Sequence, residues 1–339
     1  MMTRTRYFVI VSLLVTGVGL GTGLVAYYVG FPAGAFAGRG GPAELEYIPR
    51  DVTVIAFANV QEVMASELRQ KIRSVVPMHE DGQRELQNQT GINIETDIDR
   101  VVACLRPDRE GTKLPGAGMV LARGRFDAVK IEALMRDHGA HVEDYKGKRL
   151  VVADVSEGKP GIALAFVEPG LIALGSTNLI RTSIDLHQSG ANPQAGLQSV
   201  TTNDELMALV RSLDTGNAWA VGRFDVLTSH AQLPQNVATQ LPAITWLSVS
   251  THINGGIRGM VRAEARDDEA ANNLRDVVRG FLALAKMQSG AKPELQAMVQ
   301  SLELGGTGKT VALSFDVPAA VFDIVTGMKK RELPKPPAH

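Results

Sequence analysis

The sequence predicts an α+β fold with mixed, largely antiparallel sheets. Two observations lead to this fold class. A short β-rich run followed by a helix-capping residue and a helical pattern recurs along the chain, and turn signals separate further β-rich runs as they do in hairpins. Hydrophobic residues make up 45% of the 339 residues, which is enough to build the cores of about two domains.

The recurring unit has four copies, and each begins with a predicted strand. Asn59 and Asp127 are suited to cap the helices that follow two of these strands, because their side chains accept hydrogen bonds from backbone N–H groups. A long helix over 268–288 is predicted after the last copy. The four strands are predicted at 52–58, 118–122, 218–221 and 259–265.

The tetrapeptide Gly-Arg-Phe-Asp occurs twice, at 124–127 and 222–225. One interpretation makes the arginines and aspartates of the two copies a paired ligand clamp. The other is structural, because a Phe before an Asp N-cap forms a hydrophobic staple, although Ser229 stands at the later staple position of the second copy. We favour the structural interpretation.

Hairpins account for the remaining predicted strands. Turn-forming segments separate three β-rich runs in the middle of the chain, which predicts an antiparallel meander followed by a helix over 177–187. Near the end, two runs joined by Gly-Gly-Thr-Gly predict a hairpin, with a helix over 318–326 after it. The runs cover 149–153, 161–167 and 171–174 in the meander, and 302–304 and 310–317 in the hairpin.

The order of these elements is compatible with two loosely related halves, 47–190 and 191–327. Equivalent capping residues are separated by unequal distances, since Asn59 and Asp225 are 166 positions apart and Asp127 and Asp268 are 141 apart. Any duplication is therefore loose.

An uncharged segment at residues 7–29 predicts a transmembrane helix. A helix of 23 residues rises about 1.5 Å per residue and covers a hydrocarbon core of about 30 Å. Arg4 and Arg6 precede the segment and the next basic residue is Arg39, so the positive-inside rule places residues 1–6 in the cytoplasm. We predict a single-pass protein of the cytoplasmic membrane, with the bilayer as a partner and the folded part outside, in the periplasm.

A cleaved signal peptide is the alternative, because Ala35-Phe36-Ala37 resembles a signal-peptidase site near Ala37. The apolar segment is longer than the roughly 7–15 residues of a signal-peptide core, so we favour an uncleaved anchor. A Gly/Ala/Pro-rich segment over 30–46 predicts a flexible linker to the folded part. Residues 328–339 form a basic, Pro-rich tail.

Four glycines in the membrane segment, Gly17, Gly19, Gly21 and Gly23, form two overlapping G-x-x-x-G patterns. This spacing lets two helix backbones approach closely in lipid, so a helix–helix contact in a homodimer is one interpretation. Glycine is also common in transmembrane helices in general. We favour this second interpretation.

Charge and cysteine content exclude several classes of protein. The net charge of -1 lacks the basic excess of a nucleic-acid-binding protein, so no nucleic-acid partner is predicted. The single cysteine, Cys104, excludes an intramolecular disulfide and a thiolate cluster for zinc or iron–sulfur. In an apolar strand it is predicted to be a core residue.

Three motifs suggest chemistry at first sight. Residues 305–310 (Gly-Gly-Thr-Gly-Lys-Thr) resemble a phosphate-binding loop, but Glu303 stands where the pattern needs glycine and a β-rich run follows, so a hairpin turn is predicted. His138 and His141 lack further metal ligands nearby and flank a helix end with a capping Gly139. Ser176 lacks the flanking glycines of a nucleophile elbow. No catalytic, cofactor-binding or metal-binding residues are predicted, and no cofactor.

Several stretches after the membrane segment share hydrophobic patterns. They are 47–60 (Tyr-Ile-Pro-Arg-Asp to Ala-Asn-Val), 170–176 (Gly-Leu-Ile-Ala-Leu-Gly-Ser), 199–206 (Ser-Val-Thr-Thr-Asn-Asp-Glu-Leu), and the late pair 293–295 and 311–318. With these patterns the chain resembles bacterial single-pass, membrane-anchored envelope proteins of a domain-of-unknown-function family. The resemblance implies a membrane-tethered, extracytoplasmic α+β domain and carries no catalytic residues.

The sequence thus favours a noncatalytic module that binds a protein partner or a component of the cell envelope. The anchor, the linker and the lack of a complete catalytic motif all point in this direction. Two alternatives stay open: an extracytoplasmic hydrolase with a site assembled from dispersed residues, and a structural subunit that assembles through its glycine-rich transmembrane helix.

Overall fold

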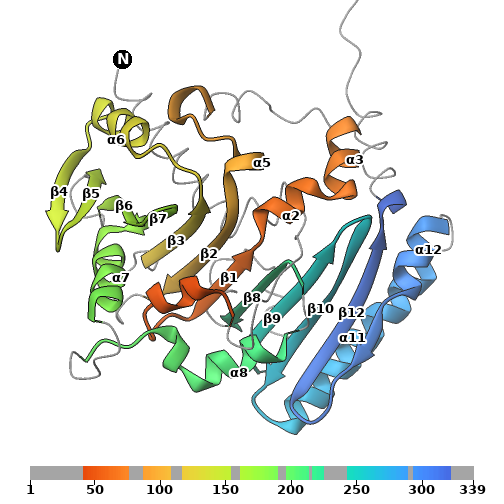
Figure 1. Ribbon diagram of the computed structural model, residues 1–339. Helices are drawn as coiled ribbons and strands as arrows, with labels where there is room; N and C mark the ends of the chain where they lie inside the picture. The colour runs from red at the N-terminus through yellow and green to blue at the C-terminus, as the bar shows by residue number, and fades with distance from the viewer. Residues whose placement is uncertain are drawn as a thin grey trace, which may run out of the picture.

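A single antiparallel sheet organises the molecule (Figure 1). The computed structural model describes residues 41–75, 87–107, 117–153, 161–189, 196–213, 216–224, 243–288 and 293–321. These residues form twelve strands in the order β11-β12-β10-β9-β8-β1-β2-β3-β7-β6-β5-β4. The strands are β1 (Val54–Ala58), β2 (Ile98–Arg106), β3 (Ala117–Gly124), β4 (His141–Tyr145), β5 (Lys148–Ala153), β6 (Ile162–Glu168), β7 (Leu171–Ser176), β8 (Ala218–Arg223), β9 (Ile244–Ile253), β10 (Gly256–Ala265), β11 (Glu303–Gly305) and β12 (Thr310–Pro318).

Helices cover both faces of the sheet. The first face, which we call the α7 face, packs against η3 (Ala43–Tyr47), α7 (Thr177–Ser189), η5 (Val200–Thr202) and α8 (Asp204–Ser212). The second, the α6 face, packs against segments of the remaining helices. These are α2 (Val60–Ala65), α3 (Glu67–Val75), α5 (Ile94–Asp97), α6 (Ala128–Asp137), α11 (Asp268–Gln288) and α12 (Pro293–Gln300).

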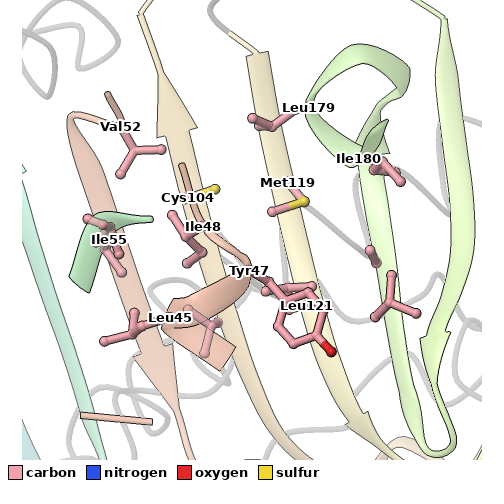
Figure 2. Packing of buried hydrophobic residues seen from close by; sticks show 14 of the residues in the cluster. Leu45, Tyr47, Ile48, Val52, Ile55, Cys104, Met119, Leu121, Leu179 and Ile180 are labelled. Atoms are coloured by element: carbon pink, nitrogen blue, oxygen red, sulfur yellow. The ribbon is translucent and has the colours of Figure 1, made fainter. Parts of the chain in front are cut away.

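Alternation along the strands divides the core between these two faces. Ile55 on β1 belongs to the cluster on the α7 face, whereas Ala58 belongs to the cluster on the α6 face, as expected for side chains three positions apart on a strand. Figure 2 shows the α7-face core, in which Ile55, Cys104 and Met119 on three neighbouring strands lie close to one another. The predicted α+β class with largely antiparallel pairing is confirmed.

The strand order is mirrored about the central β1–β8 pair. On one side it runs β1-β2-β3-β7-β6, and on the other β8-β9-β10-β12-β11. Ala56 pairs with Ala220 at the centre. A capping aspartate follows the third strand on each side, since Asp127 accepts from the N–H of Lys130 and Asp267 from that of Ala270. The predicted cap Asp268 was wrong by one residue, because Asp268 is the first residue of α11. The two predicted halves, 47–190 and 191–327, therefore share one continuous sheet.

The structure confirms the predicted meander as β5, β6 and β7, and the late hairpin as β11 and β12. Strand β9 was not predicted. Its side chains Ser248 and Ser250 are buried although they are polar, so the strand lacks the apolar alternation that identifies a half-buried strand. Of the predicted final helix, residues 319–321 are helical and the rest lies outside the described residues.

The predicted flexible linker over 30–46 overlaps η3, so its last residues belong to the folded part. Glu44 and Leu45 are buried there, with 1% and 0% of their surfaces exposed. Within the part of the chain that the structure describes, no helix has both the length and the apolar character needed to cross a membrane. Segment 7–29, the tail 328–339 and the glycines Gly17, Gly19, Gly21 and Gly23 lie outside the described residues.

Gly124, the last residue of β3, leaves no room for a side chain. A Cβ there would lie 2.0 Å from the carbonyl oxygen of Asp97 and 3.0 Å from the Cα of Ile98. Because both are backbone atoms, we expect Gly124→Ala to lower the free energy of unfolding by about 1–3 kcal/mol in urea titrations followed by circular dichroism. The control Gly280→Ala meets nothing within 4 Å in α11 and should raise it by about 0.5–1 kcal/mol. Changes of the same sign would contradict this account.

Candidate functional site: a groove beside helix α6

A cavity of about 690 Å³ lies between α6 and the hairpins that flank it. Its walls come from α6 and the residues just before it, from the β4–β5 turn with the start of β5, and from the β6–β7 turn. We call this cavity the α6 groove (α6 is beside β4 and β5 in Figure 1). The side chains on which the following argument rests are Phe126, Val129, Glu132, Ala133, Arg136, Arg149 and Phe166.

Helix α6 is fixed at both ends, which gives the groove a defined wall. At its start, the Asp127 side chain accepts a hydrogen bond from the N–H of Lys130. At its end, Gly139 adopts φ +91°, and the N–H groups of Gly139 and Ala140 donate to the carbonyls of Arg136 and Met135. This is a Schellman arrangement, which ends a helix at a glycine.

The floor of the groove is apolar. Phe126 and Phe166 pack, partly buried, against the core cluster of the α6 face. Beside them Val129 is 79% exposed, which is high for an aliphatic side chain on a helix that covers a sheet. A ligand in the groove would therefore remove apolar surface from water.

The rim carries two arginines that share one carboxylate. Glu132 Oε1 accepts a hydrogen bond from Arg149 Nη2 at 2.5 Å and forms a salt bridge with Arg136 Nη2 at 2.7 Å. The arginine side chains are 54% and 60% exposed, whereas that of Glu132 is 11% exposed. A molecule entering the groove therefore meets positive charge. Because both arginines are more than half exposed, their guanidinium groups are accessible to a molecule in the groove.

A partly buried network of charged and aromatic side chains lies behind the β6–β7 turn, on the α7 face. Tyr47 donates a hydrogen bond to Glu168, and its ring stacks on His187 with centroids 4.5 Å apart. Arg123 bridges this carboxylate, at 3.3 Å, to the buried carboxylate of Glu44, at 2.5 Å. Through Glu168, a residue of the groove wall, the network connects the groove to η3.

Tyr47 acts as a donor in this network. Burial, and then the hydrogen bond to the negative Glu168, raise the pKa of Tyr47 well above its ordinary value of 10.0. A phenol with so high a pKa stays protonated and is poorly suited to act as a general base near neutral pH. The network is thus suited to holding η3 against the sheet.

We expect Tyr47→Phe to lower the free energy of unfolding by about 1–3 kcal/mol at pH 7, because the hydroxyl donates to a charged acceptor. The raised pKa of Tyr47 means that its contribution is present below pH 10.0, the ordinary value, and is lost as the pH rises toward the folded value. The difference between wild type and variant should therefore narrow above about pH 10 in urea titrations. A difference that widens there would contradict this assignment.

A second hollow, of about 410 Å³, lies over β9, β10 and β12. Arg258 Nε and Asp316 Oδ2 face each other in it at 3.7 Å, with side chains 71% and 50% exposed. Both charges are open to solvent, and the hollow is smaller than the α6 groove. The α6 groove is the stronger candidate.

The clamp interpretation of the two Gly-Arg-Phe-Asp copies is wrong. The strand registers place Gly222 on β8 level with Gly118 on β3, through the strands β1 and β2 between them. Gly124, where the first copy begins, lies six residues further along β3, so the two copies are offset by about 20 Å along the strands. For the first copy the predicted cap is confirmed, because Asp127 accepts a hydrogen bond from the N–H of Lys130 at the start of α6. Asp225 lies outside the described residues.

The other predicted motifs have structural roles. The carbonyl of Leu134 lies 2.7 Å from Nδ1 of His138, at the end of α6, whereas His141 begins β4. Among the described residues, no three His, Cys, Asp or Glu side chains form a group that could hold a metal ion. Segment 305–310 is the turn between β11 and β12, as predicted. Burial raises the pKa of the Cys104 thiol to about 12, in line with a core residue.

The groove residues were not predicted from the sequence. Glu132 and Arg149 are 17 positions apart on different elements, and neither belongs to a motif. The one local signal was Phe126, in the first Gly-Arg-Phe-Asp copy. Neither a protein-family model, nor a curated protein, nor a solved structure matches this chain.

Proposed function

We propose that this protein is a noncatalytic binding module, held by residues 7–29 on the outer side of the cytoplasmic membrane, with the α6 groove as its binding site. The observation that carries the proposal is the combination of an apolar floor at Phe126 and Phe166 with an arginine-lined rim. Binding sites typically pair a mostly apolar surface with a few placed polar groups. The ligand is then a component of the envelope or a partner found there.

The membrane location rests on the sequence. The uncharged segment 7–29 is long enough to span a bilayer, and Arg4 and Arg6 favour a cytoplasmic N-terminus. The hydrolase, and the subunit or homodimer assembled through Gly17, Gly19, Gly21 and Gly23, stay predictions. Replacing these glycines with leucine and measuring association in membranes tests the last of them.

The test uses full-length protein purified in mild detergent and analysed by native mass spectrometry, together with N-terminal sequencing. Ala133 is exposed and lines the groove, so Ala133→Trp fills the groove without changing the core. The matched control is Ala283→Trp, at an exposed alanine of α11. We expect an intact N-terminus, and a bound component that is present in wild type and control and lost in Ala133→Trp.

Three results would count against parts of the proposal. The same bound component in Ala133→Trp would exclude the groove as its site. Chemical conversion of the component by the purified protein would favour the hydrolase instead. A chain that begins near Gly38 would overturn the anchor while leaving the groove as a binding site.

A further inference from the structure

We propose that the α6 groove binds a small amphiphilic anion, with its acidic headgroup between Arg136 and Arg149 and its apolar body over Phe126 and Phe166. This inference rests on the proposed function and names the chemical class of the ligand. A carboxylate or phosphate headgroup on an alkyl or aryl body fits the description.

The sign of the headgroup follows from charge and exposure. The triad carries two positive groups and one negative group, and the negative group, Glu132, is the least exposed of the three at 11%. A cationic ligand would meet two arginines that are more than half exposed before it reached the carboxylate. Lys148 and Glu168 also line the groove, and their opposite charges leave the excess of one positive charge unchanged, so an anion is favoured.

The geometry of the rim suits an oxyanion. The Nη2 atoms of Arg136 and Arg149 lie 2.7 and 2.5 Å from the same oxygen, Oε1 of Glu132, so they converge on one point. Glu132 is thus an example, within the protein, of a carboxylate bound by this pair of guanidinium groups. Each guanidinium has five N–H donors, so several donors remain for a second oxyanion.

The floor selects for a ligand with an apolar body. Phe126 and Phe166 supply two aromatic rings, and Val129 adds an aliphatic side chain that is 79% exposed. An anion without an apolar part would leave this surface in water. The volume of about 690 Å³ lies within the range of about 300–1,000 Å³ that is typical of small-molecule sites, so a small molecule is favoured over a polymer.

Three probes with one body separate the contributions of headgroup and body: 4-phenylbutyrate, 4-phenylbutanol and 4-phenylbutylamine. Binding is measured by calorimetry on the full-length protein in phosphatidylcholine nanodiscs, with empty nanodiscs subtracted. We expect the butyrate to bind at least tenfold more tightly than the alcohol, and the amine to bind most weakly. Equal affinity for all three probes would overturn the proposal.

Arg149→Gln tests the role of the rim and leaves the Arg136–Glu132 pair in place. The substitution removes the excess positive charge of the groove. The ratio of the affinities for phenylbutyrate and phenylbutanol should therefore fall from about ten to about one, while the affinity for phenylbutanol stays unchanged. The control is Arg279→Gln, which removes an equally exposed arginine of α11, 64% exposed, outside the groove. It should keep the preference. Loss of the preference in both variants would point to net charge and overturn the assignment to the groove.

Competition identifies the source of the headgroup. Displacement of phenylbutyrate by decanoate indicates a free carboxylate, whereas displacement by lysophosphatidylglycerol indicates a lipid headgroup, and either result supports the shared chemistry. If polyglutamate displaces phenylbutyrate but decanoate and lysophosphatidylglycerol do not, the proposal of an amphiphilic ligand is overturned. The two proposals can fail separately. If the bound component found by native mass spectrometry is lost in Ala133→Trp, the groove is a binding site. If the wild-type protein then binds all three probes equally, the binding function stands and the inference of an amphiphilic anion fails.

Discussion

Arg123→Met is expected to lower the free energy of unfolding by about 3 kcal/mol. Glu44 has 1% of its side chain exposed and accepts from Arg123 at 2.5 Å and from Arg100 at 3.0 Å. Removing Arg123 leaves the buried carboxylate with the weaker, more exposed partner and also takes one partner from Glu168. An incompletely compensated buried charge is among the costliest defects in a folded protein. Urea titration at pH 7 measures the change.

Two further variants test this account. Arg100→Met should lower the free energy of unfolding by about 1 kcal/mol or less, because Arg100 is 39% exposed. This substitution leaves the contact between Glu44 and Arg123 intact. In the double variant Glu44→Gln/Arg123→Met the buried charge is gone, so it should be more stable than Arg123→Met alone. If the double variant were the less stable of the two, the charge on Glu44 would not be the cause.

The same carboxylate predicts a dependence on acid. Burial acts to raise the pKa of Glu44, but the hydrogen bond from Arg123 and the charge of Arg100 outweigh it, and the pKa is lowered from its ordinary 4.5. The contribution of Glu44 is therefore present above pH 4.5 and is lost as the pH falls through the folded value. Wild type should lose stability over this range more steeply than Glu44→Gln.

Trp219→Ala is expected to lower the free energy of unfolding by about 3–5 kcal/mol. Trp219 is 1% exposed and stacks on Phe57, with ring centroids 5.8 Å apart. It lies on β8 and pairs with Phe57 on β1, so the indole fills the core at the joint between the two sides of the sheet. The resulting cavity is enclosed by strands on both sides of the joint, which limits how far it can collapse.

The chain contains two tryptophans, which allows a matched measurement. Trp246 is partly exposed and donates from Nε1 to Glu205 at 2.8 Å, so Trp246→Phe should cost about 1 kcal/mol. Fluorescence of that variant then reports on Trp219 alone, and that of Trp219→Phe on Trp246 alone. Because β8 and β9 belong to one continuous sheet, the fluorescence transition of each variant should have the same midpoint as the loss of its β-structure followed by circular dichroism. A fluorescence midpoint that differs from the circular-dichroism midpoint of the same variant would mean that the sheet does not unfold as one unit.

The sequence predicted the parts of the fold that local chemistry determines. Asp127 was identified as a cap because an aspartate before a helical pattern accepts backbone hydrogen bonds, and it does so in the structure. Segment 305–310 was predicted to turn because of its glycines, of which Gly306 and Gly308 adopt φ +91° and +56°. Both features depend on a few neighbouring residues.

The features that were missed depend on residues far apart in the chain. Glu44 stood in a Gly/Ala/Pro-rich stretch that predicted a linker, and its partners Arg100 and Arg123 are 56 and 79 positions away. The α6 groove depends likewise on a contact between Arg149 and Glu132 across two elements. The neighbours of Arg100, Arg123 and Arg149 in the sequence do not reveal these contacts, because a charged residue on a strand or helix most often faces solvent.

The strand order also determines how the sheet ends. Its two outermost strands are β11, three residues long, and β4, which carries Glu143 and Asp144. Long, flat, apolar outer strands recruit further chains by backbone pairing and lead to aggregation, whereas short or charged ones discourage it. Both ends of this sheet are protected in these two ways. Copies at high concentration would thus avoid edge-to-edge association.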